Sequence, residues 1–210
     1  MLEAEARKAQ SLAHPNIGTV YDFDRDGAEI FIVMELLTGR PLSRLLTSSV
    51  GQPLPGAEIA GVLRGLCAGL SHAHQRGVVH SDLKPGNIFV SPENEVKIID
   101  FGLATAVQTS LPKEVAGLTV TYASPEMFED APRDPRDDIF ALGCIAYQLL
   151  TGVHPFRLKP INEAVEQGIR PEPIGDIDRD AWRAIDRALS FEHEARLETI
   201  DAFATAVFDG

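Results

Sequence analysis

An amide and a carboxylate side chain stand at the two ends of a predicted β-hairpin. The runs 88–90 (IFV) and 96–99 (VKII) are short, apolar and rich in β-branched residues, and SPENE between them is typical of a turn. If the turn is centred between residues 93 and 94, Asn87 lies opposite Asp100, with the two Cβ atoms about 4.5–5.5 Å apart. Amide and carboxylate oxygens can bind Mg²⁺ together with substrate phosphates. The spacing therefore predicts chemistry on phosphate groups.

Asp82 and Lys84 lie just upstream of this hairpin. Because Pro85-Gly86 interrupts regular structure, the segment is predicted to be a loop whose side chains converge on the same end of the hairpin. Phosphoryl transfer needs a metal ion to neutralise charge, a cation near the moving group and a carboxylate to orient the attacking hydroxyl. Asp82 and Lys84 supply the carboxylate and the cation, and Asn87 and Asp100 at the hairpin ends supply the ligands of the metal ion.

The run HSDLKPGN at 80–87, followed by DFG at 100–102, resembles the catalytic loop and metal-binding triplet of eukaryotic-type protein kinases. The resemblance implies that Asp82 is the catalytic base, that Lys84 contacts the γ-phosphate of ATP, and that Asn87 and Asp100 hold Mg²⁺. A lysine at this place in the loop is the serine/threonine-kinase form.

The same resemblance gives structural roles to three neighbours of these residues. His80 could be interpreted as a general base, but the family favours a packing residue beneath the loop. Phe101 and Gly102 complete the DFG triplet.

The run 30–37 resembles the hinge between the two kinase lobes. Met34 would then guard the adenine pocket, and the backbone groups of Glu35 and Leu37 would face the base. With Phe89 and Lys84, these two residues form the expected nucleotide-binding set.

Residues 103–126 are polar, small and turn-rich, and they resemble an activation segment that ends at the SPE triplet. Thr119 matches the threonine that bonds the catalytic aspartate in serine/threonine kinases. The resemblance also implies a buried ion pair between Glu126 and Arg196, and a cap by Asp138 on the backbone of the catalytic loop. Thr105, Thr109 and Ser110 are candidate phosphorylation sites or simply loop composition.

Ser81 stands where regulated kinases usually carry an arginine that receives an activation-segment phosphate. We therefore expect the segment to become ordered without a phosphate paired at this position. His72 and His74 are two residues apart on a predicted helix, so they do not share a face as a zinc pair would. Structural or surface roles are favoured for both.

Glu5 takes the place of the family's helix glutamate, which normally pairs with a lysine on an earlier strand. Residues 1–210 contain neither that strand nor the family's glycine-rich loop before the helix. Glu5 is therefore either a regulatory residue without its expected partner or an exposed glutamate on a charged helix. On their own, the 210 residues are expected to bind ATP poorly and to show little autophosphorylation.

The kinase resemblance implies an α+β protein of the protein-kinase-like fold, with an incomplete N-lobe at 1–37 and a mostly helical C-lobe at 38–210. The expected N-lobe contains a helix at 1–13 and two strands, within 14–23 and 28–36, joined by an Asp-Gly turn. The expected C-lobe contains helices at 42–46, 57–75, 138–152, 161–168, 180–190 and 198–208.

The composition limits the partners. The net charge of −12 argues against a nucleic-acid partner, which usually meets a basic face. Cys67 and Cys144 lie in apolar helical patterns and are predicted to be buried thiols, which fits a cytoplasmic protein. No apolar run in the sequence reaches the length of a membrane span.

Three functions remain open from the sequence. The first is a serine/threonine kinase domain that transfers the γ-phosphate of ATP, with Mg²⁺, to serine or threonine hydroxyls of proteins. The second is a pseudokinase that serves as a binding scaffold. The third is a small-molecule phosphotransferase of the aminoglycoside-kinase type, against which Lys84, the DFG triplet and the SPE triplet argue together. Substrate identity, upstream signal and oligomeric state do not follow from these residues.

Overall fold

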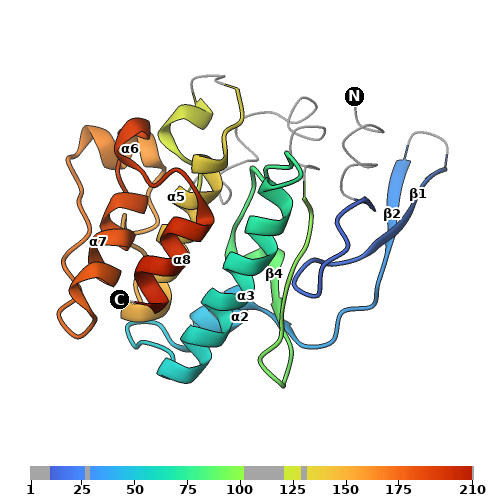
Figure 1. Ribbon diagram of the computed structural model, residues 1–210, viewed down its shortest axis with the longest axis horizontal. Helices are drawn as coiled ribbons and strands as arrows, with labels where there is room; N and C mark the ends of the chain where they lie inside the picture. The colour runs from blue at the N-terminus through green and yellow to red at the C-terminus, as the bar shows by residue number, and fades with distance from the viewer. Residues whose placement is uncertain (1–9, 27–28, 102–120, 129–131, 210) are drawn as a thin grey trace.

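The computed structural model describes residues 10–26, 29–101, 121–128 and 132–209. Within these ranges a two-stranded ribbon stands beside a larger body built of helices and one small sheet (Figure 1). This arrangement confirms the α+β class and the mostly helical C-lobe. The division of the chain at residues 37 and 38 stays a prediction.

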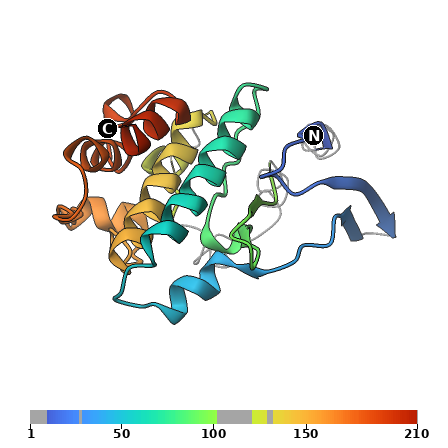
Figure 2. The same cartoon turned by 60° about the horizontal axis from the view of Figure 1, so that its bottom comes forward.

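The ribbon consists of β1 (Val20–Asp26) and β2 (Glu29–Met34), which pair antiparallel. Both strands were expected, and the structure confirms them. The register shifts between Val20 and Asp22, which is an irregularity that the alternation of the sequence does not reveal. Figure 2 shows the ribbon reaching away from the helices, with its far end remote from the body.

The body contains a three-stranded antiparallel sheet in the order β3 (Arg40–Pro41), β4 (Ile88–Val90) and β5 (Val96–Ile98). Its hairpin was expected, but the expected register was wrong by one residue. Ile88 pairs with Ile98, so Asn87 faces Ile99 rather than Asp100. The turn closes with a bond from Ser91 N to Glu95 O.

The cause of the different register lies in the turn. Asn94 adopts a left-handed conformation with φ of 63°. Asparagine tolerates this region better than most residues, and the five-residue loop is centred on residue 93 rather than between residues 93 and 94 as expected.

Two long helices form the centre of the body. They are α3 (Gly56–His74) and α5 (Pro135–Thr151), and nearly every apolar side chain of α5 is buried. The expected start of the second helix at Asp138 was wrong, because Asp134 and Asp137 form a capping box and Pro135 occupies the first turn. Both helices otherwise agree with their sequence patterns.

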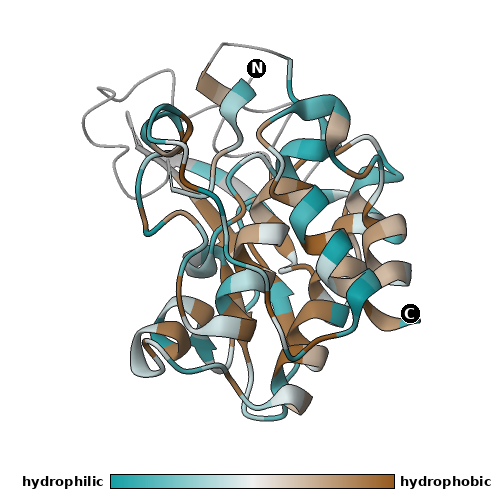
Figure 3. Ribbon diagram, turned by 90° about the vertical axis from the view of Figure 1, so that its left-hand side faces the viewer, coloured by the Kyte–Doolittle hydropathy of each residue, from teal (hydrophilic) through white to brown (hydrophobic). Residues whose placement is uncertain are grey.

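Shorter elements cover this centre. They are α2 (Leu42–Ser48), η1 (Pro85–Asn87), η2 (Pro125–Phe128), α6 (Ile161–Glu166), α7 (Arg179–Ala188), η3 (His193–Ala195) and α8 (Ile200–Phe208). In Figure 3 the hydrophobic segments lie mainly where helices face one another, and hydrophilic turns lie outside. Cys67 and Cys144 are buried free thiols, as expected. Within the described ranges, every helix is too short or too polar to cross a lipid bilayer.

Candidate active site

Asp82, Lys84 and Asn87 form one contact group at the start of β4. Lys84 Nζ lies 2.6 Å from Asp82 Oδ2, and Asn87 Nδ2 donates to the backbone oxygen of Asp82 at 3.0 Å and to Oδ2 at 3.3 Å. The Asp82 side chain is 14% exposed. Its other oxygen, Oδ1, is buried and has no hydrogen-bond partner among the described residues. One oxygen of the carboxylate is thus fixed, and the other is available to a ligand.

Asp138 holds the backbone of this loop. Its carboxylate accepts the N–H groups of His80 at 2.8 Å and Ser81 at 2.9 Å, and it lies 2.7 Å from His74 Nε2. Burial alone would raise the pKa of Asp138, but the hydrogen bond and charge of His74, with the contribution of His80, lower it. The carboxylate therefore stays ionised inside the protein. The cap that the kinase resemblance implies is present.

Ser81 has φ of 64°, in the left-handed region. This conformation is uncommon for a serine, and it redirects the chain directly after the two N–H groups that Asp138 accepts. The fixed backbone in turn places Asp82 at the head of the loop.

His80 is fully buried, and both of its ring nitrogens are engaged. Nδ1 accepts the N–H of Asp82 at 3.2 Å, so Nε2 carries the proton and donates to the oxygen of Ile99 at 2.8 Å. The ring also packs against Phe101 with 4.7 Å between centroids. These contacts describe a packing residue that joins the loop to the end of β5.

The backbone of Asp100 differs from the expected β-strand pairing with Asn87. It has φ of 64°, so the chain leaves the strand geometry at this residue instead of continuing opposite Asn87. Burial raises the pKa of the Asp100 carboxyl, and the charge of Asp82 adds to this effect while His80 and Lys84 oppose it. The Asp100 carboxyl is therefore electrostatically coupled to Asp82 and Lys84.

Asp100 also lines a small hollow between the ribbon and the body, together with Phe101 and five residues of the N-terminal part: Ile17, Gly18, Val20, Ile32 and Met34. Met34 was expected beside the nucleotide. The other predicted nucleotide-binding residues, Glu35, Leu37 and Phe89, do not line this hollow.

Glu35 immediately follows β2, and Phe89 lies in the middle strand of the small sheet. The N–H of Glu35 is used internally, because it donates to Thr19 O at 2.9 Å. Lys97 Nζ lies 2.7 Å from Glu35 Oε1, a contact that the sequence did not suggest.

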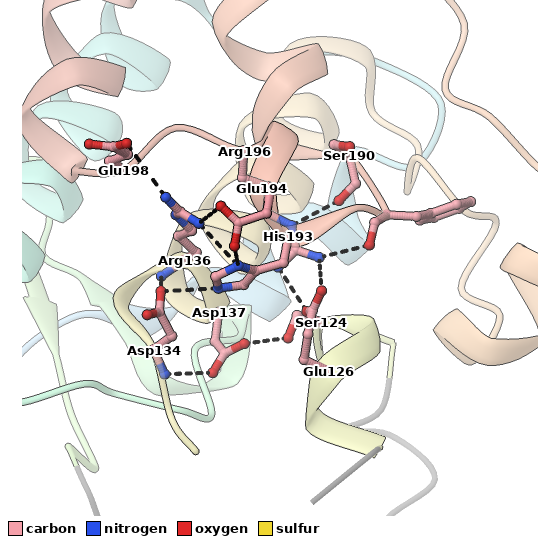
Figure 4. Close-up of polar contacts among 11 residues, drawn as sticks. Ser124, Glu126, Asp134, Arg136, Asp137, Ser190, His193, Glu194, Arg196 and Glu198 are labelled. Atoms are coloured by element: carbon pink, nitrogen blue, oxygen red, sulfur yellow. Dashed lines mark hydrogen bonds and ion pairs between the residues drawn. The ribbon is translucent and has the colours of Figure 1, made fainter. Parts of the chain in front are cut away.

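Arg196 and Glu126 form the implied ion pair. Arg196 is 1% exposed, its NH1 lies 2.9 Å from Glu126 Oε2, and its NH2 donates to Oε1 at 3.0 Å. The guanidinium also donates to Ser190 O and Phe191 O, so the buried charge is well satisfied (Figure 4). The pair ties the end of the activation segment to the chain between α7 and α8.

Ser124 donates to Asp137 Oδ1 next to this pair, a contact that the sequence analysis missed (Figure 4). Asp137 Oδ2 accepts the N–H of Asp134 at 3.1 Å as part of the α5 capping box. Two aspartates three positions apart before an apolar run are the signal that could have revealed this cap.

The remaining expectations concern the helix histidines and several residues outside the described ranges. His72 packs on the ring of His14 at 4.7 Å, and no cluster of three or more His, Cys, Asp or Glu side chains suited to a metal ion occurs in the described ranges. Several candidates lie outside the described residues: Glu5, Gly102, Thr105, Thr109, Ser110 and Thr119.

Comparison with known proteins gives a consistent assignment. The sequence pattern of the protein kinase domain matches residues 1–205. The chain is 38% identical over 217 residues to the serine/threonine-protein kinase Pkn1 of Myxococcus xanthus, covering 97% of this chain and 31% of Pkn1. It is 40% identical over 154 residues to the serine/threonine-protein kinase PknL of Mycobacterium tuberculosis, covering 72% of this chain and 38% of PknL.

The fold is similar to the crystal structure of the Mycobacterium tuberculosis PknI kinase domain, with a TM-score of 0.77, 26% identity, and coverage of 99% of this chain and 77% of that chain. The chain thus spans about a third of the length of the curated relatives it matches and most of one solved kinase domain. Because the family match covers nearly all 210 residues and agrees with the fold, the chain belongs to the eukaryotic-type serine/threonine protein kinase family.

Proposed function

We propose that this protein transfers the γ-phosphate of ATP to serine or threonine hydroxyls of protein substrates. The observation that carries the proposal is the Asp82 carboxylate, which holds Lys84 with one oxygen and buries the other without a partner among the described residues. A carboxylate in this state can accept the proton of an incoming hydroxyl, because that hydroxyl would satisfy the free oxygen. Relatives named as serine/threonine-protein kinases support the same substrate class.

Each residue of the group has a separate task in this proposal. Asp82 orients the attacking hydroxyl and takes its proton, and Lys84, held at 2.6 Å from Asp82, places its positive charge beside the transferred group. Asn87 keeps Asp82 in place through two donated hydrogen bonds. Asp138 and His80 keep the loop backbone rigid, so the reacting atoms need no rearrangement.

The residues fit the Mg²⁺ that the family uses generally. Asn87 Nδ2 is engaged on Asp82, which turns the amide oxygen toward another partner, and Asp100 is a carboxylate whose pKa is raised by burial. A divalent cation would compensate that buried negative charge. Asn87 and Asp100 would therefore hold Mg²⁺, which neutralises phosphate charge when bound with ATP.

The expected partners and location extend this proposal. The net charge of −12 suits protein substrates better than nucleic acids. Burial raises the pKa of Cys67 to about 12, so this thiol stays protonated. Two buried free thiols support a reducing compartment such as the cytoplasm.

The proposal is tested by phosphate incorporation from radiolabelled ATP with Mg²⁺, into the protein itself and into casein, using the full length that the gene encodes. Asp82→Asn should lower the rate by about 10²- to 10⁴-fold, because the amide cannot accept the proton. Asp186→Asn is the matched control, since it makes the same chemical change at an exposed position of α7.

An unaltered protein that binds Mg²⁺ and ATP, measured by thermal stabilisation, but transfers no phosphate would contradict the proposal and favour the scaffold role. Transfer that persists undiminished in Asp82→Asn would contradict the assignment of the base.

A further inference from the structure

Glu35 is held by two separate segments at the point where the chain leaves β2. Its Oε1 accepts from Lys97 Nζ at 2.7 Å and from the N–H of Thr19 at 2.7 Å, while its own N–H donates to Thr19 O at 2.9 Å. The side chains of Glu35 and Lys97 are 20% and 30% exposed. Burial would raise the pKa of Glu35, but the bonds from Lys97 and Thr19 lower it, so the carboxylate remains charged.

Lys97 occupies a defined place in the small sheet. It lies directly opposite Phe89, and Phe89 in turn lies opposite Pro41. Side chains of directly opposed residues stand on the same face of an antiparallel sheet, so Pro41, Phe89 and Lys97 form one row across the three strands. The other face, which carries Ile88 and Ile98, is buried in the core.

The segment 35–39 links β2 to β3 and is fixed at both ends. At one end Glu35 is bonded to Lys97 on β5, which is an edge strand of the sheet. At the other end Gly39 has φ of +108°, and a Cβ there would lie 2.2 Å from Val90 O, so its backbone packs directly on β4. The segment therefore runs from the β5 side of the sheet to β3, with Phe89 in the strand between.

We propose that the Lys97–Glu35 ion pair positions this segment for binding of the adenine base. The pair fixes the start of the segment relative to the sheet, and so sets its separation from Phe89, which also belongs to the expected nucleotide-binding set. The inference rests on the proposed function, because it assumes that the nucleotide lies between Phe89 and the segment. Lys97 acts through Glu35, so both are positioning residues.

The test measures adenosine and ADP·Mg²⁺ binding by calorimetry to the full-length protein. Lys97→Met removes the charge and keeps the apolar stem, and Glu35→Gln keeps an oxygen that can accept from Thr19. Each variant should lower the affinity for adenosine and for ADP·Mg²⁺ by the same factor, about three- to tenfold, as expected for a partly shielded ion pair. The double variant should bind no more weakly than either single variant, because both remove the same interaction.

Two further variants make the result specific. Lys97→Arg retains the charge and should bind both ligands within about twofold of the unaltered protein. Lys159→Met removes a lysine that lies 3.9 Å from Glu163 on α6, far along the chain from this sheet, and should leave both affinities unchanged. Melting temperatures without ligand show whether each variant is folded. If Lys97→Met does not fold, Glu35→Gln and Lys97→Arg together still test the inference, because the first removes the ion pair and the second retains it.

Affinities of Lys97→Met within about twofold of the unaltered protein would overturn the inference and leave the proposed function standing. Loss of ADP·Mg²⁺ binding with normal adenosine binding would also overturn it, because Lys97 would then contact phosphate rather than position the base site. A loss of affinity in the double variant equal to the product of the two single losses would also overturn the inference, because the two residues would then act independently. An unaltered protein that binds neither ligand would overturn both proposals.

Discussion

The ribbon and the helical body differ in how their apolar side chains are used. In the ribbon, Tyr21, Phe31 and Val33 are 61%, 44% and 43% exposed, whereas the apolar side chains along α5 are almost entirely buried. The two ribbon strands form hydrogen-bonded ladders with each other and with no third strand in the described ranges. The body therefore has its own core, and the ribbon's position depends on bonds to β5 from Asn16, Gly18 and Glu35.

This difference bears directly on the candidate site. Asp82, Lys84 and Asn87 lie in the body, where Asp138 and His80 fix the loop. The expected base-binding segment lies where the ribbon joins the body. The structure thus has the proposed phosphate-transfer residues in the body and the proposed base-binding segment at the junction with the ribbon.

The largest effect should follow from breaking the buried ion pair of the body. Arg196→Met leaves the Glu126 carboxylate without its partner, so the free energy of unfolding should fall by about 3–5 kcal/mol. Urea denaturation measures this loss. Arg183→Met, which removes an exposed pair with Asp180, is the control and should cost less than about 1 kcal/mol. Equal losses in the two variants would mean that burial of Arg196 has no energetic role.

The body should also be the acid-sensitive region, because it buries His154. Burial lowers the pKa of His154 to about 4, and Nδ1 accepts the N–H groups of Phe156 and Leu158. In the unfolded chain this histidine gains its proton near its ordinary pKa of 6.5, so the unfolded state binds more protons between pH 6.5 and 4.

The contribution of His154 to stability is therefore complete above pH 6.5 and declines by about 2–3 kcal/mol as the pH falls toward 4. Urea titrations at a series of pH values measure the slope, and His154→Gln should flatten it. An unchanged slope in that variant would show that other groups cause the acid sensitivity.

The smallest effects should come from matched valines in the two sheets. Val96→Thr places a hydroxyl in the core beside α3, where Val96 is 1% exposed, and should cost about 1–3 kcal/mol. Val33→Thr makes the same change on the exposed ribbon and should change stability by less than about 0.5 kcal/mol. Thermal unfolding of both variants provides the comparison, and a costly Val33→Thr would indicate that this face of the ribbon is covered in the folded protein.

The helices were the most predictable part of the fold, since their apolar periodicity agrees with what is buried. The start of α5 was missed because the expected start at Asp138 came from the kinase resemblance, and the capping box of Asp134 and Asp137 was not recognised. The hairpin register depended on Asn94 in a left-handed conformation, a choice that the turn composition permits but does not dictate.

The candidate site was predictable as a set of residues but not as a geometry. The motif identified Asp82, Lys84, Asn87 and Asp100, yet the left-handed conformation of Asp100 does not follow from a pattern in the sequence. Long-range contacts such as Lys97–Glu35 and Ser124–Asp137 join residues whose sequence separation carries no pattern. Such contacts depend on the packed fold, so reasoning from local sequence could not find them.

The first turn of α5 has one more consequence. Asp138 accepts from the loop that presents Asp82, and its neighbour Asp137 accepts from Ser124 at the other side of the site. The two anchoring points are joined by a single peptide unit, whose length varies less than any side-chain contact. The catalytic-loop backbone before Asp82 and the Ser124 hydroxyl are thus held by side chains of adjacent residues, and a shift of the first turn of α5 would move both together.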